Sequence, residues 1–312
     1  MNEAPLVSIC SITFNHEKYI SQAIEGFLMQ KTNFHYEILI HDDASLDGTV
    51  DIIKEYVKKY PDLIKPIFQS ENQYSKGIKP YHILYKKALG KYIARCEGDD
   101  FWIDPYKLQK QVDVLSSNSN YIFSAHKINV VNRKGLIVDK KIGQGHNKTV
   151  ITQLDCISKG VNIHPSSLMY RNVLTKIPEY FKKVISEDGT LVVELLTYGN
   201  GHFSDEIMSC YRLNETGVWS NTTDLERNVE WINMEFFLMN RLPQYSEKIK
   251  GNISEKSNWI IHHLDRHNIF DFLKFWKKWV VSGWQYSIPL LFNILLKFAY
   301  RFFTRKLKYY LS

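Results

Sequence analysis

Apolar residues in the first hundred positions gather into short runs that are separated by amphipathic stretches. Residues 6–13 (LVSICSIT) are apolar and β-branched, which is typical of a buried strand, and apolar positions within residues 17–29 recur at helical spacing. This alternation of strands and helices predicts an α/β fold with a mainly parallel sheet covered on both faces. Further strands are predicted at residues 36–40, 64–69 and 91–96.

The second helix of this pattern follows a pair of acidic residues. Val50, Ile53 and Val57 share one of its faces, and Ser45 or Thr49 is its predicted N-terminal cap. Beyond Trp102 the pattern is weaker. It indicates helices near residues 106–115 and 189–198, and strands near residues 121–131, 136–138 and 207–213.

The net charge of the chain is concentrated at one end. The chain has 40 Lys and Arg against 33 Asp and Glu, and residues 270–312 hold eight of these cations with one anion, so this segment carries the whole formal excess of +7. A neutral body with a basic, aromatic tail favours an anionic membrane surface as a partner, and we expect no binding to nucleic acid.

The tail itself is not apolar enough to predict a membrane-spanning helix. Residues 279–296 carry no charge but include Pro289, Asn293 and other polar positions. At helical spacing an apolar side opposes a cationic side, which predicts a helix lying in the membrane interface at the cytoplasmic face of the cell membrane. Packing of this helix on the body of the protein is the alternative. The opposing sides are Leu291, Ile294, Leu295, Phe298, Phe302 and Phe303 against Lys297, Arg301, Arg305 and Lys308.

Cysteine usage and the first residues indicate a reducing compartment. Residues 1–10 contain an acidic residue and no basic region, so we expect no secretory signal. The four cysteines are far apart and form no CxxC pair, so neither a zinc site nor a redox dithiol is indicated. They are Cys10, Cys96, Cys156 and Cys210.

The strongest chemical signal is the sequence Glu97-Gly98-Asp99-Asp100, directly after the predicted strand 91–96. Three carboxylates this close repel one another unless a cation lies between them, and oxygen ligands suit a hard divalent ion. A solvated turn is the alternative, because Asp and Gly are common turn residues.

A second acidic pair, Asp42-Asp43, follows the predicted strand 36–40. Parallel α/β sheets bind ligands at the carboxyl ends of their strands, so both acidic segments are expected at one edge, where they form one nucleotide site. Capping of the helix near Thr49 is the alternative for the pair. No GxGxxG follows the first strand and no GxxxxGK[ST] occurs in the chain, which disfavours a dinucleotide fold and a P-loop.

Taken in order, several segments resemble family 2 glycosyltransferases with the GT-A fold. They are VSICSITFNHEKYISQAIEGFLMQ, EILIHDDASLDGT, the approach to EGDDFW, DPYKLQKQVDVL, HPSSLMYR, and Tyr211-Arg212 followed by Gly217-Val218-Trp219-Ser220. The resemblance implies a Rossmann-like mixed α/β sheet, a nucleotide-sugar donor such as a UDP-sugar, Mn²⁺ or Mg²⁺ as cofactor, and inversion at the anomeric carbon.

The resemblance also implies roles for individual residues. Asp43 would contact uracil, Asp99 the ribose and Asp100 the metal, while Asp188 matches the catalytic base. Glu187 is the competing base, and a helix cap is the alternative role of Asp188. Apart from the resemblance, the chain lacks a phosphate-cradling glycine loop, so a bound metal and cations such as Lys76 or Lys79 would have to face the diphosphate. The full sets are Ile12, Thr13, Asn15, Asp42, Asp43 and Asp99 for the nucleotide, Glu97, Asp99 and Asp100 for the metal, and His164, Ser166, Tyr211, Arg212 and Trp219 for the acceptor or diphosphate.

The predicted organisation has three parts. Residues 1–222 form the glycosyltransferase domain, with a nucleotide-binding half (1–105) and an acceptor half (106–222); residues 223–269 form a helical extension and residues 270–312 the membrane-associating segment. The leading hypothesis is an inverting glycosyltransferase acting on a glycan or lipid-linked acceptor, such as a surface polysaccharide intermediate. The alternatives are a sugar-nucleotide nucleotidyltransferase and a non-catalytic module that binds membranes or glycans.

Overall fold

A computed structural model of the chain describes residues 4–140, 142–143, 148–159, 163–174, 177–178, 181, 187–214, 223–264 and 296. The chain divides into two compact units, Met1–Gly217 and Val218–Ser312, and each is described by itself.

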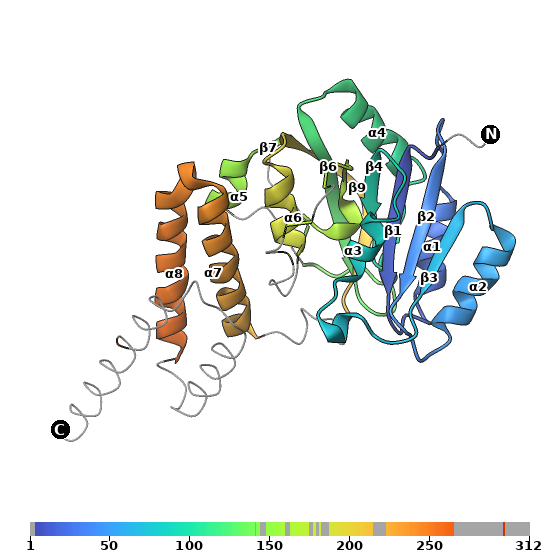
Figure 1. Ribbon diagram of the computed structural model, residues 1–312, viewed down its shortest axis with the longest axis horizontal. Helices are drawn as coiled ribbons and strands as arrows, with labels where there is room; N and C mark the ends of the chain where they lie inside the picture. The colour runs from blue at the N-terminus through green and yellow to red at the C-terminus, as the bar shows by residue number, and fades with distance from the viewer. Residues whose placement is uncertain are drawn as a thin grey trace, which may run out of the picture. The chain divides into compact units, whose positions relative to one another are not determined.

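The first half of the sheet is parallel, as the hydrophobic pattern predicts. β1 pairs on one side with β2 and on the other with β4, and β2 also pairs with β3. These four strands coincide closely with the predicted runs, so the α/β class is confirmed (Figure 1). Their bounds are β1 (Val7–Thr13), β2 (Tyr36–Asp42), β3 (Ile64–Phe68) and β4 (Tyr92–Arg95).

The second half of the sheet corrects the prediction of a mainly parallel arrangement. β8 runs antiparallel to both β4 and β6, and the short strands β5 and β7 run antiparallel to β9, while β6 and β9 are parallel. Over the described residues the sheet is therefore mixed, and its order is β3-β2-β1-β4-β8-β6-β9-β5. The bounds are β5 (Phe101–Trp102), β6 (Tyr121–Val131), β7 (Val150–Ile151), β8 (Met169–Arg171) and β9 (Asn200–Arg212).

One face of the sheet packs on α1 (Ile20–Leu28), α2 (Thr49–Lys59) and α4 (Lys107–Ser117). Figure 1 shows α1 and α2 on one side of β1 to β3 and α3 (Pro80–Tyr85) on the other. The predicted cap of α2 is wrong, because Gly48 occupies the cap position and no side chain caps this helix. The hydroxyls of Ser45 and Thr49 instead accept hydrogen bonds from the amides of Asn15 and His16, in the loop that follows β1.

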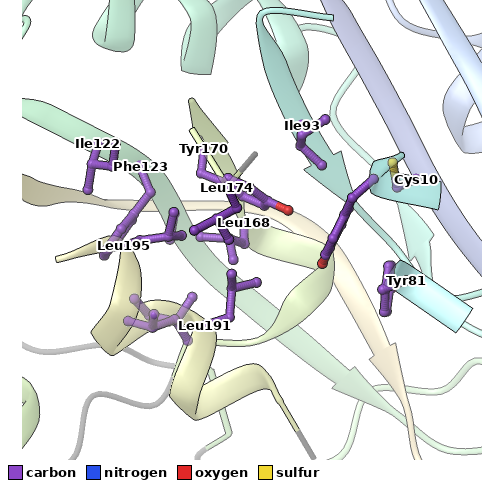
Figure 2. Packing of buried hydrophobic residues seen from close by; sticks show 14 of the residues in the cluster. Cys10, Tyr81, Ile93, Ile122, Phe123, Leu168, Tyr170, Leu174, Leu191 and Leu195 are labelled. Atoms are coloured by element: carbon purple, nitrogen blue, oxygen red, sulfur yellow. The ribbon is translucent and has the colours of Figure 1, made fainter. Parts of the chain in front are cut away.

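The opposite face packs on α3 and α6 (Asp188–Leu195). Figure 2 shows Cys10 and Ile93 from the parallel strands and Tyr81 from α3 in the same buried cluster as Leu191 and Leu195 from α6. Each fully buried side chain of this size contributes about 1.5–3 kcal/mol relative to exposure. This cluster therefore fixes the start of α6 relative to the ends of the strands. The remaining short elements of this unit are η1 (Tyr74–Lys76), η2 (Pro165–Ser167) and α5 (Gln153–Lys159).

The second unit is a helical hairpin of α7 (Asp224–Arg241), η4 (Pro243–Tyr245) and α8 (Ser246–Leu264). α7 begins with a capping box, in which Thr223 and Glu226 each bond to the backbone of the other. Among the residues that the structure covers, no helix is both long enough and apolar enough to traverse a bilayer. The predicted membrane-associating segment 270–312 lies outside the described residues except for Leu296.

Candidate active site

The end of β1 is the centre around which the predicted residues assemble. Thr13 pairs in register with Asp42 at the end of β2, and the amide of Asp43 donates to the Thr13 carbonyl at 3.0 Å. On the other side of β1, the amide of Gly98 donates to the Ile12 carbonyl at 2.9 Å. Both acidic segments therefore border the last residues of β1, which is the convergence that the strand order predicts.

Glycine at position 98 permits this close approach. A Cβ atom added to Gly98 would lie 2.8 Å from Oγ1 of Thr13, closer than real Cβ contacts occur. Beside this contact, Nε2 of His16 lies 3.8 Å from Oδ2 of Asp99. The turn formed by residues 97–100 thus lies directly against the residues that leave β1.

Asn15, in the loop after β1, and Ala44, in the loop after β2, adopt left-handed backbone conformations with φ 56° and 64°. Asparagine tolerates this conformation, whereas for alanine it costs about 1–2 kcal/mol. The surrounding hydrogen bonds hold the two loops together: the Asn15 amide donates to Oγ of Ser45, and Oδ1 of Asn15 accepts from the Leu46 amide, both at 2.8 Å. Strained backbone of this kind concentrates at functional sites.

The first acidic pair organises the loops around it. Asp42 accepts hydrogen bonds from the amide of Ser45 at 2.9 Å and from its hydroxyl at 2.5 Å. Asp43 accepts from the amides of Gln73 and Tyr74 at 2.8 and 3.0 Å. Both carboxylates are buried and neither caps α2. Their contacts with a nucleotide stay a prediction.

In the second acidic segment, Asp100 has one oxygen with a hydrogen-bond partner and one without. Its Oδ1 accepts from the Arg212 amide at 2.9 Å, whereas its Oδ2 is buried without a hydrogen-bond partner and lies 3.8 Å from Nδ1 of His164. Burial, together with the charges of Asp99 and Glu97, raises the pKa of Asp100 well above its usual range. Burial, then Asp188 and Asp99, raises the pKa of Glu97 to about 8.

This charge distribution fits a bound cation. In the described part of the chain, no three His, Cys, Asp or Glu side chains form a ready-made set of metal ligands. The unpartnered Oδ2 of Asp100 nevertheless has the donor chemistry that Mg²⁺ and Mn²⁺ prefer, and a cation there would relieve the mutual repulsion of the carboxylates.

Arg212 secures the acidic turn from β9. Its Nε donates to the Asp99 carbonyl at 3.0 Å, its Nη2 to Oε1 of Gln22 at 2.6 Å, and its Nη1 to the carbonyls of Asn132 and Arg133 at 3.3 and 3.2 Å. The side chain is nearly fully buried. These contacts show Arg212 packing and pairing within the protein, and its predicted contact with the acceptor or diphosphate stays a prediction.

His164 and Ser166 lie on the Asp100 side of the site. The ring of His164 stacks at a tilt on Tyr211 with 4.3 Å between centroids, and its Nδ1 lies 2.9 Å from Oγ of Ser166. Burial lowers the pKa of His164 to about 4, so its ring is neutral at physiological pH. The predicted Trp219 lies outside the described residues.

Asp188 is the first residue of α6 and lies one position after the cap residue. The cap position belongs to Glu187, and Oδ1 of Asp188 accepts a hydrogen bond from Nη2 of Arg95 at 2.8 Å. Glu187 is 6% exposed and binds Nε2 of His82 at 2.8 Å, whereas the side chain of Asp188 is 27% exposed. Of the two candidate bases, Asp188 is therefore the more accessible to an acceptor.

The two lysines considered for the diphosphate, Lys76 and Lys79, lie in and just after η1. The amides of Gln73 and Tyr74 at the start of this segment donate to Asp43. Lys76 forms an ion pair with Glu71, and Nζ of Lys79 lies 5.3 Å from the centre of the Tyr74 ring. Neither contact assigns a diphosphate role.

Three residues that were not predicted from the sequence contact predicted site residues: Arg95, His16 and Gln22. One signal was present for Arg95, since it is a charged residue inside the otherwise apolar run YIARC at residues 92–96. A buried charge needs a partner, so its position in a central strand marks a polar contact beneath the sheet. No comparable signal identifies His16 or Gln22.

The family model for glycosyl transferase family 2 matches residues 8–177, and this chain belongs to that family. The prediction of a family 2 glycosyltransferase is thereby confirmed, and the protein is a glycosyltransferase. An uncharacterized Mycobacterium tuberculosis protein (strain H37Rv) is 30% identical over 273 residues, which is 83% of this chain and 75% of that protein.

Solved structures confirm the GT-A fold. S. aureus TarS 1-349 in complex with UDP-GlcNAc superposes with a TM-score of 0.56 at 20% identity, covering 84% of this chain and 72% of that one. The mannosyltransferase PcManGT from Pyrobaculum calidifontis, in complex with GDP-Man and Mn²⁺, superposes with a TM-score of 0.54 at 13% identity, covering 96% and 87%.

Proposed function

We propose that this enzyme transfers a sugar from a UDP-sugar to an acceptor hydroxyl with inversion at the anomeric carbon, and that a divalent cation assists the reaction. The observation that carries the proposal is the convergence of the two acidic segments on the end of β1, with a buried Asp100 oxygen that lacks a hydrogen-bond partner.

The known ligands of similar structures support a nucleotide-sugar donor. TarS binds UDP-GlcNAc, and PcManGT binds GDP-Man together with Mn²⁺. In this chain, residues 12–15 and Asp43 would border the nucleoside. Asp100, with Glu97 and Asp99, would hold the cation, which when bound stabilises the negative charge on the departing diphosphate.

Asp188 is the residue that we assign to the acceptor. Its partly exposed carboxylate lies at the start of α6, within the electrostatic influence of Glu97. In the transfer, the bond from the anomeric carbon to the phosphate oxygen breaks, and a bond from that carbon to the acceptor oxygen forms. The proton of the acceptor hydroxyl passes to Asp188, and the nucleoside diphosphate leaves with the electron pair of the broken bond. General-base assistance of this kind contributes about 10²- to 10⁴-fold.

A panel of nucleotide sugars tests the donor assignment. We expect one UDP-sugar, with Mn²⁺ present, to raise the melting temperature of the purified chain and to release UDP on incubation. At about 100 times its Kd, a ligand stabilises by about 2.7 kcal/mol. EDTA should abolish both effects. Stabilisation by GDP-mannose alone would contradict the UDP assignment, and release of pyrophosphate from UTP and a sugar phosphate would contradict sugar transfer.

We further propose that the enzyme acts at the cytoplasmic face of the membrane on a lipid-linked precursor of a surface glycan. The support is the basic, aromatic segment 270–312, which carries the whole formal excess of +7. We expect the full chain to sediment with vesicles containing phosphatidylglycerol, and a chain truncated at Phe270 to stay in the supernatant. Vesicles of phosphatidylcholine alone are the control for charge. Equal membrane recovery of both chains would contradict the proposal.

A further inference from the structure

Arg95 is a buried cation at the end of a central strand. Neighbouring residues of β4 alternate between the two faces of the sheet, so Arg95 shares with Ile93 the face that packs on α3 and α6. Arg95 is 1% exposed, although arginine is rarely buried unless it is paired. The position therefore requires a specific role for its charge.

The guanidinium group of Arg95 is held between an aromatic ring and a carboxylate. Its central carbon lies 3.7 Å from the centre of the Tyr81 ring of α3, and its Nη2 donates to Oδ1 of Asp188 at 2.8 Å. The contact with Tyr81 restricts the guanidinium to one plane, because a cation over an aromatic face is attracted to it. The group is thus fixed from one side and directs a hydrogen bond to Asp188 from the other.

The neighbouring carboxylate of Glu187 does not accept this hydrogen bond from Arg95. Its carboxylate binds Nε2 of His82 at 2.8 Å, so two adjacent acidic residues take different partners. Nε and Nη1 of Arg95 have no hydrogen-bond acceptor among the described residues. The bond to Asp188 is accordingly a direct polar contact between the end of β4 and the start of α6.

We propose that Arg95 is a positioning residue, which holds the Asp188 carboxylate in the orientation needed to receive the acceptor proton. The inference rests on the proposed function, in which Asp188 is the base. β4 leads directly into the acidic turn at residues 97–100, so one strand would set the distance between the donor-binding carboxylates and the base. Arg95 itself touches neither substrate, because its side chain is buried beneath the sheet.

The test compares Arg95→Met with Arg95→Lys in the full chain, using the UDP-sugar that the panel selects, Mn²⁺, and water as acceptor. We expect Arg95→Met to lower kcat for UDP release by about 10- to 100-fold, since small misplacements of a reacting group cost this much. KM for the donor and the Kd of UDP should change by less than about twofold, because donor binding does not involve this contact. Arg95→Lys should recover at least about threefold over Arg95→Met, because a cation remains near Asp188.

Lys107→Met is the matched control. Lys107 is also a fully buried basic residue on an aromatic ring, 4.1 Å from the centre of the Trp102 ring, and Trp102 belongs to the core cluster on the opposite face of the sheet. We expect its removal to change melting temperature but leave kcat unchanged. If Lys107→Met lowers kcat as much as Arg95→Met does, the effect of Arg95 is structural and the inference is wrong.

A double-mutant cycle separates the inference from the proposed function. If Arg95 acts through Asp188, Arg95→Met should cause no further loss in the Asp188→Asn background. Additive losses would overturn the inference while leaving Asp188 as the base. Wild-type kcat in Asp188→Asn would instead overturn the proposed base. Should Arg95→Met fail to fold, Arg95→Lys alone and in the Asp188→Asn background supplies the same cycle.

Discussion

Replacing Asp188 by asparagine should lower kcat for sugar transfer by about 10²- to 10⁴-fold, because the amide cannot accept the proton of the acceptor hydroxyl. Asparagine has nearly the shape of aspartate, and its carbonyl oxygen can still accept the hydrogen bond that Arg95 donates at 2.8 Å. The start of α6 should therefore stay in place. Since the substitution removes a transition-state contact, kcat and kcat/KM for the donor should fall together, and the Kd of UDP should change by less than about twofold.

Glu187→Gln is the matched control for this prediction. Glu187 precedes Asp188, but its carboxylate is buried against His82, and a glutamine oxygen can still bind that ring. We expect the control to retain kcat within about fivefold of the unmodified chain, as is usual for a residue outside the reacting atoms. Inactive Glu187→Gln together with active Asp188→Asn would transfer the role of base to Glu187. Full activity of both variants would leave the reaction without a base at this position.

The strands that form the site could be predicted because burial dictates their sequence. β1 is a continuous apolar and β-branched run, and its predicted end at Thr13 is its observed end. The acidic residues follow such runs directly, so the positions of Asp43 and Asp100 at one edge follow from strand order. The prediction succeeded here because each feature depends on residues that are close in the sequence.

The antiparallel half of the sheet could not be predicted in the same way. β5 is only two residues long, and it pairs with Ser209 and Cys210, more than a hundred positions away. A pair of aromatic residues after a turn carries no periodicity from which such a partner could be identified. The resemblance to a family implied the mixed sheet, whereas the hydrophobic pattern indicated a mainly parallel one.

The prediction of the α2 cap was wrong for a different physical reason. Ser45 and Thr49 are good capping residues, but their hydroxyls join the loops that follow β1 and β2, where they accept from the amides of Asn15 and His16 at 2.8 and 2.9 Å. Tertiary hydrogen bonds thus occupy the atoms that local capping would use.

The role of Arg95 also depends on a tertiary contact. Its strand was predicted from the sequence, but its partner Asp188 lies 93 positions further along the chain.

Replacing Asp100 by asparagine should abolish stabilisation by Mn²⁺ and lower activity by at least about 10²-fold, because a neutral amide cannot replace a charged oxygen ligand of a hard cation. Asparagine keeps the oxygen that accepts from the Arg212 amide at 2.9 Å, so the turn should keep its shape. For the unmodified chain, Mn²⁺ at about 100 times its Kd should add about 2.7 kcal/mol to the free energy of unfolding. The variant should show no such gain in thermal or chemical unfolding.

Without metal, the same substitution should not destabilise the protein. Burial and the neighbouring carboxylates raise the pKa of Asp100 well above its usual range, so the metal-free folded state binds its proton more tightly than the unfolded chain does. Stability from this group is therefore lost as the pH rises through its folded pKa, and asparagine removes that loss. In EDTA at neutral pH, the melting temperature of Asp100→Asn should equal or exceed that of the unmodified chain.

Asp113→Asn controls for the loss of one negative charge from the same unit. Its carboxylate is exposed and accepts from Nε2 of Gln109 at 2.9 Å. We expect this variant to respond to Mn²⁺ as the unmodified chain does. If Asp100→Asn also keeps the full response to Mn²⁺ and the activity, the cation does not bind at Asp100. The nucleotide sugar itself would then have to bond to the unpartnered Oδ2 of Asp100. The acidic turn would in that case be a donor site without a metal.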